Sequence, residues 1–196
     1  EQDYPPALVS LGLCYEQGRG VEQNRPRAVK LYLQAGRGGS AAGYCNAGYC
    51  YLRGIGVQED PDMAVSLLQK AADQGYPRAL DLLGDCYERG VGAPRDGQKA
   101  AELYRRAAEQ DYPPALVSLG LCYEQGTGVP KDEAQALAYY RKAGELGDSV
   151  GACNAGYCLL YAIGGPEDPQ EAPVWLRKAA GQDSPRAMNL LGFCYR

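Results

Sequence analysis

Cysteine is the residue type in this 196-residue sequence with the widest chemistry, since a thiol can form a disulfide, bind zinc or act as a nucleophile. Histidine is absent, so the commonest general base and metal ligand is missing. A zinc site would therefore need four converging thiolates, and a nucleophilic cysteine would have no imidazole beside it. Six of the eight cysteines recur every 36 residues, and two more lie five residues before a member of that series: Cys14, Cys50, Cys86, Cys122, Cys158 and Cys194, then Cys45 and Cys153.

The composition is that of a folded, mildly acidic protein, with 45% apolar residues and a net charge of −4. Lysine and arginine are scattered, which argues against nucleic acid or an anionic membrane surface, because both need a basic face. No run approaches the roughly 20 apolar residues that cross a bilayer, so we expect no membrane insertion. No GxSxG, SxxK or glycine-rich stretch ending in GK occurs, so we expect no enzyme activity and no cofactor.

The whole sequence repeats with a period of 36 residues, which is the distance from Gly12 to Gly48. In every copy a small or leucine side chain precedes the glycine: Leu11-Gly12, Ala47-Gly48, Leu83-Gly84, Leu119-Gly120, Ala155-Gly156 and Leu191-Gly192. A Gly-x-Gly turn follows in the first four copies, whereas the fifth has Ala162 and Gly164. A second segment then carries one alanine per copy: Ala28, Ala64, Ala100, Ala136 and Ala172.

Each repeat is predicted to contain two helices, because apolar or small residues recur at steps of three and four in both segments. Proline opens most first helices, where its missing N–H costs nothing, and glycine ends them. The glycine of the Leu-Gly pair is expected to let the second helix approach closely against small residues. In the fifth repeat Pro173 follows the alanine position, so its second helix is expected to begin late, near Glu171, or to kink.

A slower period of 108 residues is also present, because three repeats form a block that has been copied. Residues 1–18 return unchanged at 109–126, and the first 21 residues of the two blocks differ only at Arg19 and Thr127. The second and fifth repeats share CNAGYC, and the third and sixth share PRA. Either recent duplication or deliberate construction explains this fidelity.

The pattern AxxxLGxxYxxGxGVxxDxxxAxxxYxxAAxxG, met most fully from Ala115 to Gly147, resembles the Sel-one-like repeat, a relative of the tetratricopeptide repeat. The resemblance covers practically the whole chain. It implies an all-α fold, a single right-handed α/α solenoid of about five and a half 36-residue helix-turn-helix repeats whose relatives act as adaptors and scaffolds. The repeats are placed at 1–36, 37–72, 73–108, 109–144, 145–180 and, in part, 181–196.

Within such a stack the cysteines are expected to be free thiols in small buried slots. Adjacent copies lie roughly 9 to 10 Å apart, beyond the limit of about 7 Å between the Cα atoms of a disulfide. Cysteine-rich bacterial members of the family carry a cysteine on each helix of a repeat, and here no second helix has one. Free thiols favour a cytoplasmic location, and a disulfide or a metal site is the alternative.

The first helices of stacked repeats line a concave face, and the resemblance implies that positions −6, −3, +1 and +4 from the Leu-Gly glycine point inward. The candidate binding residues at −3, +1 and +4 are Val9, Leu13, Glu16, Cys45, Tyr49, Leu52, Asp81, Asp85, Glu88, Val117, Leu121, Glu124, Cys153, Tyr157, Leu160, Asn189 and Phe193. The −6 position adds Pro6, Ala42, Arg78, Pro114, Val150 and Arg186, and Arg196 is the last +4 residue.

We expect a non-catalytic scaffold or adaptor that holds a protein or peptide with basic and apolar anchors. Large apolar side chains at solvent-facing positions mark contact sites, and the anchor candidates are Leu13, Tyr49, Leu121, Tyr157 and Phe193. The acidic positions Asp81, Asp85 and Glu88 would receive a basic residue. In one alternative this ridge packs against the next first helix, and in another the apolar first and last repeats associate end to end.

Overall fold

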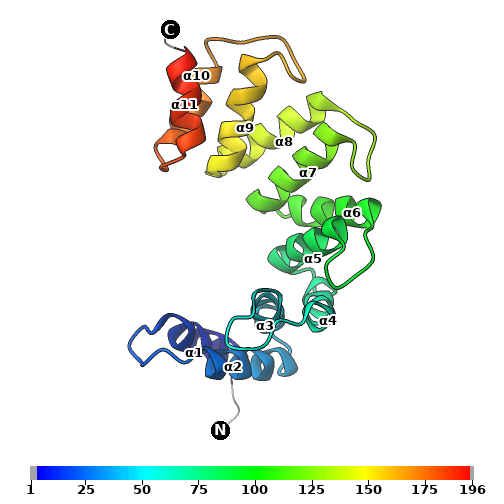
Figure 1. Ribbon diagram of the computed structural model, residues 1–196, viewed down its shortest axis with the longest axis vertical. Coiled ribbons are helices and arrows are strands. Elements are labelled where there is room, and N and C mark those ends of the chain that lie inside the picture. The colour runs from blue at the N-terminus through cyan, green and yellow to red at the C-terminus, as the bar shows by residue number, and fades with distance from the viewer. Residues whose placement is uncertain (1–3, 195–196) are drawn as a thin grey trace. The chain divides into compact units, whose positions relative to one another are not determined.

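The computed structural model describes residues 4–194, and all their regular structure is α-helical, which confirms the all-α prediction (Figure 1). The helices are α1 (Pro5–Gln17), α2 (Arg25–Arg37), α3 (Ala41–Arg53), α4 (Pro61–Ala72), α5 (Pro77–Arg89), α6 (Gly97–Ala108), α7 (Pro113–Gln125), α8 (Glu133–Glu145), α9 (Ser149–Leu160), α10 (Ala172–Ala180) and α11 (Pro185–Cys194). Odd-numbered helices are the first helices of the repeats and even-numbered helices are the second.

The chain forms two compact units that divide between Asp96 and Gly97. In the first unit, consecutive helices from α1 to α5 pack against each other, and α3 also contacts α1 and α5. In the second unit, consecutive helices from α6 to α11 pack against each other, and α9 also contacts α7 and α11. Contact between consecutive helices and between neighbouring first helices is the packing of an α/α solenoid, as expected.

Local signals set the ends of the helices. Proline lies in the first turn of α1, α5 and α7, while Asp60 and Asp132 accept a backbone N–H at the starts of α4 and α8. The first helices α1, α3, α5 and α7 end at glycines in the left-handed region, with φ from 63° to 73°. A residue with a Cβ resists this conformation, so the glycine pattern of the sequence fixes these ends.

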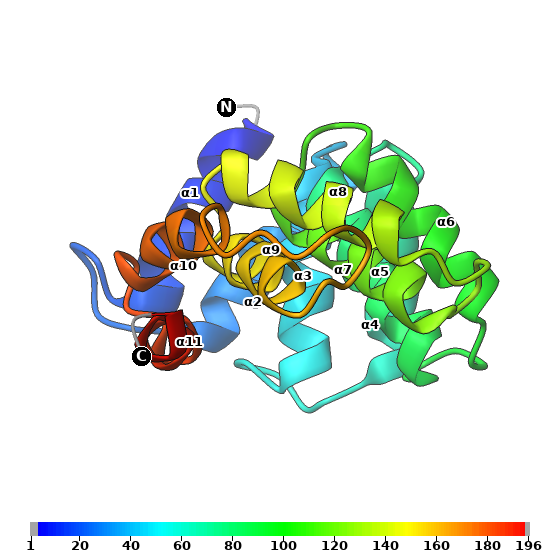
Figure 2. The ribbon, with the colours of Figure 1, turned by 90° about the horizontal axis from the view of Figure 1, so that it is seen from above.

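The fifth repeat departs from this scheme as the sequence predicted. Ala162 occupies the left-handed slot with φ 54°, where the other repeats have glycine. The chain then runs through a long connection, visible between α9 and α10 in Figures 1 and 2, before α10 begins at Ala172 with Glu171 as its N-cap. The late start near Glu171 is therefore confirmed.

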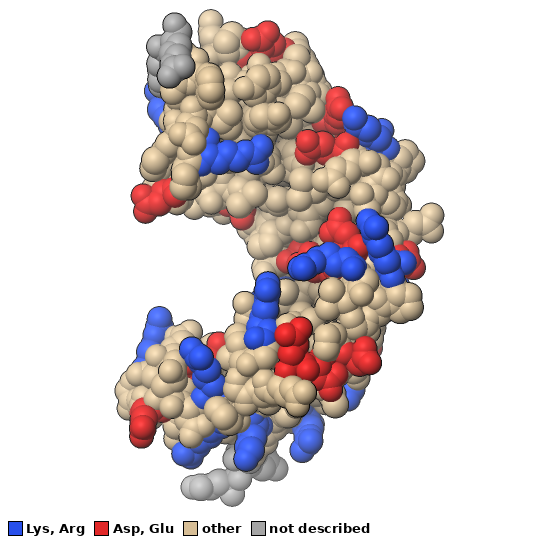
Figure 3. All heavy atoms as spheres, viewed as in Figure 1, with Lys and Arg blue, Asp and Glu red and all other residues tan. Residues whose placement is uncertain are grey.

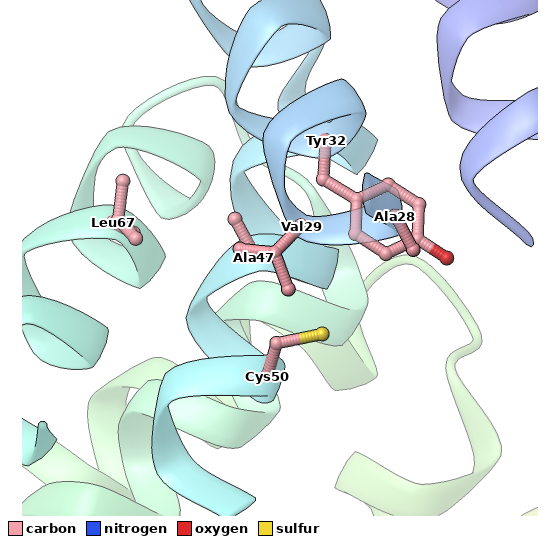
Figure 4. Close-up of a cluster of buried hydrophobic side chains, with 6 residues drawn as sticks. All are labelled: Ala28, Val29, Tyr32, Ala47, Cys50 and Leu67. Atoms are coloured by element: carbon pink, nitrogen blue, oxygen red, sulfur yellow. The ribbon is translucent and has the colours of Figure 1, made fainter. Parts of the chain in front are cut away.

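The core lies between the helices of each pair. In the first unit, Ala28, Val29 and Tyr32 of α2 pack with side chains of α3 and α4 (Figure 4). A Cβ added to Gly12 would lie 2.5 Å from the Tyr32 ring, so this glycine admits a whole aromatic ring. The small residues expected against that glycine are therefore replaced by tyrosine here and at Gly120, and by leucine at Gly48 and Gly156.

Candidate functional site

The candidate binding residues at the −3 position are mostly covered by protein. Cys45, Asp81, Val117 and Cys153 are each at most 8% exposed, and Val9 packs against the core cluster around Tyr32. These side chains therefore contribute to packing inside the protein and present little surface to a ligand.

Two of the candidate acids at the +4 position have partners inside their own repeats. The Tyr32 hydroxyl donates a hydrogen bond to Glu16 Oε2 at 2.6 Å, and the Tyr140 hydroxyl donates to Glu124 Oε2 at 2.5 Å. Burial, followed by the hydrogen bond to the carboxylate, raises the pKa of both tyrosines far above the usual value. Glu16 and Glu124 therefore each link a first helix to a second helix through a hydrogen bond. The third candidate acid at this position, Glu88, is half-buried.

Side chains at the +1 position reach solvent to different extents. Leu13 is 39% exposed, Leu121 37% and Phe193 62%, while Tyr49, Tyr157 and Asp85 are half-buried. These residues lie on α1, α3 and α5 of the first unit and on α7, α9 and α11 of the second. Three further candidates accompany them, with Leu52 and Leu160 half-buried and Asn189 exposed.

An arginine joins neighbouring first helices at the same place in each unit. In the first unit, Arg78 Nη1 of α5 donates a hydrogen bond to Asn46 Oδ1 of α3 at 2.9 Å, and its Cζ lies 5.3 Å from the centroid of the Tyr49 ring. In the second unit, Arg186 of α11 bonds Asn154 of α9 at 2.9 Å and lies 5.1 Å from the Tyr157 ring. We call these the Asn-Tyr-Arg clusters of the two units.

The asparagines of these clusters were absent from the candidate residues. Asn46 and Asn154 lie one turn before the tyrosines, and Asn154 is only 7% exposed. Each holds its arginine over the aromatic ring, and this combines a hydrogen bond with a cation–π contact. The shared sequences CNAGYC and PRA contain all three members of each cluster, so the duplication itself was the signal that could have found them.

A hollow of about 360 Å³ opens beside the cluster of the first unit, between α3 and α5. Its lining includes Tyr49, Leu52, Arg53, Leu82 and Asp85. This volume is near the lower end of the range for small-molecule pockets and suits one or two side chains of a partner. On the face in Figure 3, basic and acidic side chains are interspersed without a continuous basic patch.

All eight cysteines are free thiols. Burial raises the pKa of Cys45 and Cys86 to about 11 and that of Cys50 and Cys158 to about 12. Such thiols remain protonated at neutral pH and pack as small apolar groups. Within residues 4–194 no group of three or more cysteine, aspartate or glutamate side chains is arranged to hold a metal ion.

Each of the helices that the structure describes is too short or too polar to cross a membrane.

Residues 5–40, 41–76, 77–112, 113–148 and 149–184 each match the Sel1 repeat. These matches keep the 36-residue period and begin four residues later than the boundaries placed from the sequence. No curated protein sequence matches the chain.

Solved structures give the same result. A Sel1 repeat protein from Oxalobacter formigenes is 34% identical with a TM-score of 0.89, over 98% of this chain and 76% of that protein. The protective antigen c5321 of uropathogenic Escherichia coli is also 34% identical, with a TM-score of 0.87 over 98% of this chain and only 41% of its own length. Cysteine rich protein B of Helicobacter pylori is 27% identical with a TM-score of 0.54, over 65% of this chain and 96% of that protein.

Sel1 repeat proteins generally mediate protein–protein interactions as non-catalytic scaffolds. The five matched repeats and these structural relatives establish that the chain belongs to the Sel1 repeat family.

Proposed function

We propose that this protein is a non-catalytic scaffold that binds a segment of another protein on the first-helix surface of its units. The observation that carries the proposal is the pair of Asn-Tyr-Arg clusters beside exposed +1 side chains. Each cluster holds an aromatic ring and a guanidinium in one fixed arrangement, so little side-chain entropy is lost when a partner binds. Tyrosine and arginine are also enriched among residues that dominate binding energies at protein interfaces.

Fewer side chains are available for contact with a partner than the sequence suggested. The −3 residues are mostly buried, and Glu16 and Glu124 accept hydrogen bonds from tyrosines of the second helices. These side chains therefore stabilise the fold. Contact with a partner is assigned to the +1 residues, to Leu52 and Leu160, and to the arginines at −6. Burial of the aromatic and aliphatic members would supply the affinity, at roughly 25 cal/mol for each Å² of apolar surface.

The test is the capture of binding partners by the purified chain, followed by calorimetry with the partner that is identified. Tyr49→Ala combined with Tyr157→Ala removes the aromatic member of both clusters and should abolish binding. The matched control is Met63→Ala combined with Val174→Ala, because these side chains are 43% and 56% exposed on second helices, one in each unit. Undiminished binding by the tyrosine variant, or an equal loss in the control, would exclude the first-helix surface.

End-to-end self-association remains the second candidate function, and one observation favours it. A Cβ added to Gly192 of α11 would have no atom within 4 Å, whereas a tyrosine or leucine of a second helix lies against the equivalent glycines Gly12, Gly48, Gly120 and Gly156. The same face of α11 exposes Met188 at 49%. Light scattering over a concentration series distinguishes the two functions, because end-to-end assembly gives a mass that rises with concentration and a scaffold that acts as a monomer gives a constant mass.

A further inference from the structure

The two Asn-Tyr-Arg clusters occupy equivalent positions, 108 residues apart, but the side chains around them differ. Arg53, whose Cζ lies 5.9 Å from the Tyr49 ring, is replaced by Tyr161 beside Tyr157. Two acidic positions on α5 are replaced on α11, Asp81 by Asn189 and Asp85 by Phe193. The first unit therefore surrounds its cluster with charges of both signs, and the second unit surrounds the same cluster with neutral and aromatic side chains.

The guanidinium of Arg186 is held in place and retains unused hydrogen-bonding capacity. It donates one bond to Asn154 at 2.9 Å and lies 5.1 Å from the Tyr157 ring, so its plane and position are fixed from two sides. A guanidinium has five N–H donors in a planar fork that matches both oxygens of a carboxylate. None of the ion pairs among the residues described in this structure involves Arg186, and its side chain is exposed.

The charge around the two arginines favours different ligands. On α5, Asp81 and Asp85 lie three and seven residues after Arg78, which places all three on one helical face and opposes the approach of an anion. On α11 the same positions are neutral, so the charge of Arg186 is not offset from its own helix. Arg78 and Arg186 are each the second residue of their helix, so the helix dipole adds to the field of both and the difference between them comes from Asp81 and Asp85.

An apolar surface adjoins this guanidinium. The rings of Tyr157 and Tyr161 lie 4.7 Å apart between centroids with planes tilted by 50°, and Tyr161 is 52% exposed. Phe193 on α11 is 62% exposed and shares a helical face with Arg186, and Val150 on α9 is 52% exposed. Exposed aromatic side chains on two contacting helices form the kind of surface that binds another aromatic or large aliphatic side chain.

We propose that Arg186 together with Tyr157, Tyr161 and Phe193 binds a peptide segment of a partner protein in which a carboxylate lies next to an aromatic or large aliphatic side chain. The carboxylate pairs with the guanidinium fork of Arg186, and the apolar side chain packs on the three rings. This inference rests on the proposed scaffold function and assigns the ligand class of its second unit. It also predicts that the first unit, with its mixed charges, does not take the same ligand.

The experiment begins with a phage-displayed library of random short peptides selected on the purified full chain. The selected peptides should contain aspartate or glutamate next to an aromatic or large aliphatic residue. One such peptide and its analogue with the acid replaced by the amide are then titrated by calorimetry against the unmodified protein, Arg186→Gln and the control Arg177→Gln, which changes an exposed arginine on the second helix α10 of the same unit. Far-UV circular dichroism checks that both variants fold.

The expected result is a loss of about tenfold in affinity for the acidic peptide in Arg186→Gln, the size of one charge-assisted hydrogen-bonded pair. The amide analogue should lose a similar factor with the unmodified protein and lose nothing further in Arg186→Gln, because the two changes remove the same contact. Arg177→Gln should bind like the unmodified protein.

Three outcomes would overturn the proposal. Peptides that are selected but lack the acid, or that bind Arg186→Gln undiminished, refute the ligand class and leave the scaffold function standing. A library that yields no binding peptide contradicts the scaffold function and this inference with it. A rise in molecular mass with concentration that Arg186→Gln abolishes assigns the surface to a second copy of the chain instead.

Discussion

Replacing Gly120 with alanine should destabilise the protein, although alanine is the better helix former. The added Cβ would lie 2.5 Å from Tyr140 Cε1 and 2.8 Å from Cδ1, against the 3.5 to 4.0 Å of an ordinary contact between carbon atoms. The ring must therefore move by roughly 1 Å, yet it is fully buried and its hydroxyl is bonded to Glu124 at 2.5 Å. Overpacking of this kind costs about 1–3 kcal/mol, and the helix preference for alanine returns about 0.5–1 kcal/mol. We expect a net loss of about 1–2 kcal/mol in the free energy of unfolding.

The matched control is Gly192→Ala, which makes the same change at the equivalent position of α11. No atom lies within 4 Å of a Cβ built there, so only the helix preference acts and the stability should rise by about 0.5–1 kcal/mol. Urea unfolding followed by far-UV circular dichroism gives both values from the shift of the midpoint at constant slope. The opposite signs are the decisive result, and a Gly120→Ala protein as stable as the parent would refute the close-approach argument.

Four further measurements test other parts of the structure. Ala162→Gly should raise the free energy of unfolding by about 0.5–1 kcal/mol. The substitution removes about 1–2 kcal/mol of strain in the left-handed backbone conformation, and the greater backbone entropy of glycine in the unfolded chain offsets part of this gain. An unchanged urea midpoint would contradict the strain. Cys50 and Cys158 should leave the free energy of unfolding unchanged between neutral pH and pH 9. Above pH 9 each should lower it by about 1.4 kcal/mol per pH unit, because these thiols ionise near pH 9 when unfolded and near pH 12 when folded. A flat alkaline profile in unfolding experiments would show that the thiols are not buried. Tyr140→Phe should lower the free energy of unfolding, measured by thermal unfolding, by about 1–2 kcal/mol, and by less when Glu124→Gln is already present. If the effects of the two substitutions simply add, the hydrogen bond between these residues does not stabilise the protein. Thiol titration of the denatured, unreduced protein should count eight free sulfhydryls, and six or fewer would reveal a disulfide.

The candidate positions on the first helices came from the resemblance to the Sel-one-like repeat and not from the helical period alone. Tyr49 and Tyr157 emerged in this way, and the structure places them beside exposed surface. Burial could not be predicted in the same way. The −3 and +1 positions lie on nearly the same face of a first helix, yet Cys153 of α9 is 3% exposed and Phe193 of α11 is 62% exposed, because packing against neighbouring helices decides burial.

The partners of polar side chains also depended on tertiary packing. Glu124 looks like a solvent-facing acid in the sequence, but the second helix brings the Tyr140 hydroxyl to it across 16 residues of chain. Asn154 looks unremarkable until α11 brings Arg186 to it across 32 residues. Neither separation belongs to a local pattern such as a helical turn or a cap, so no sequence rule identifies these pairs.

The duplicated segment separates the contribution of the sequence from that of the tertiary structure. Residues 5–17 and 113–125 are identical, and both form a thirteen-residue helix with proline in the first turn and glycine at the end. Helix type and helix ends were therefore determined by the sequence alone, because the interactions that set them are local. Burial was not, since Leu11 of α1 is 39% exposed while its copy Leu119 in α7 is fully buried. Helix α7 follows α6 and packs against it, whereas α1 is the first helix described, so the same side chain is core or surface according to its neighbours.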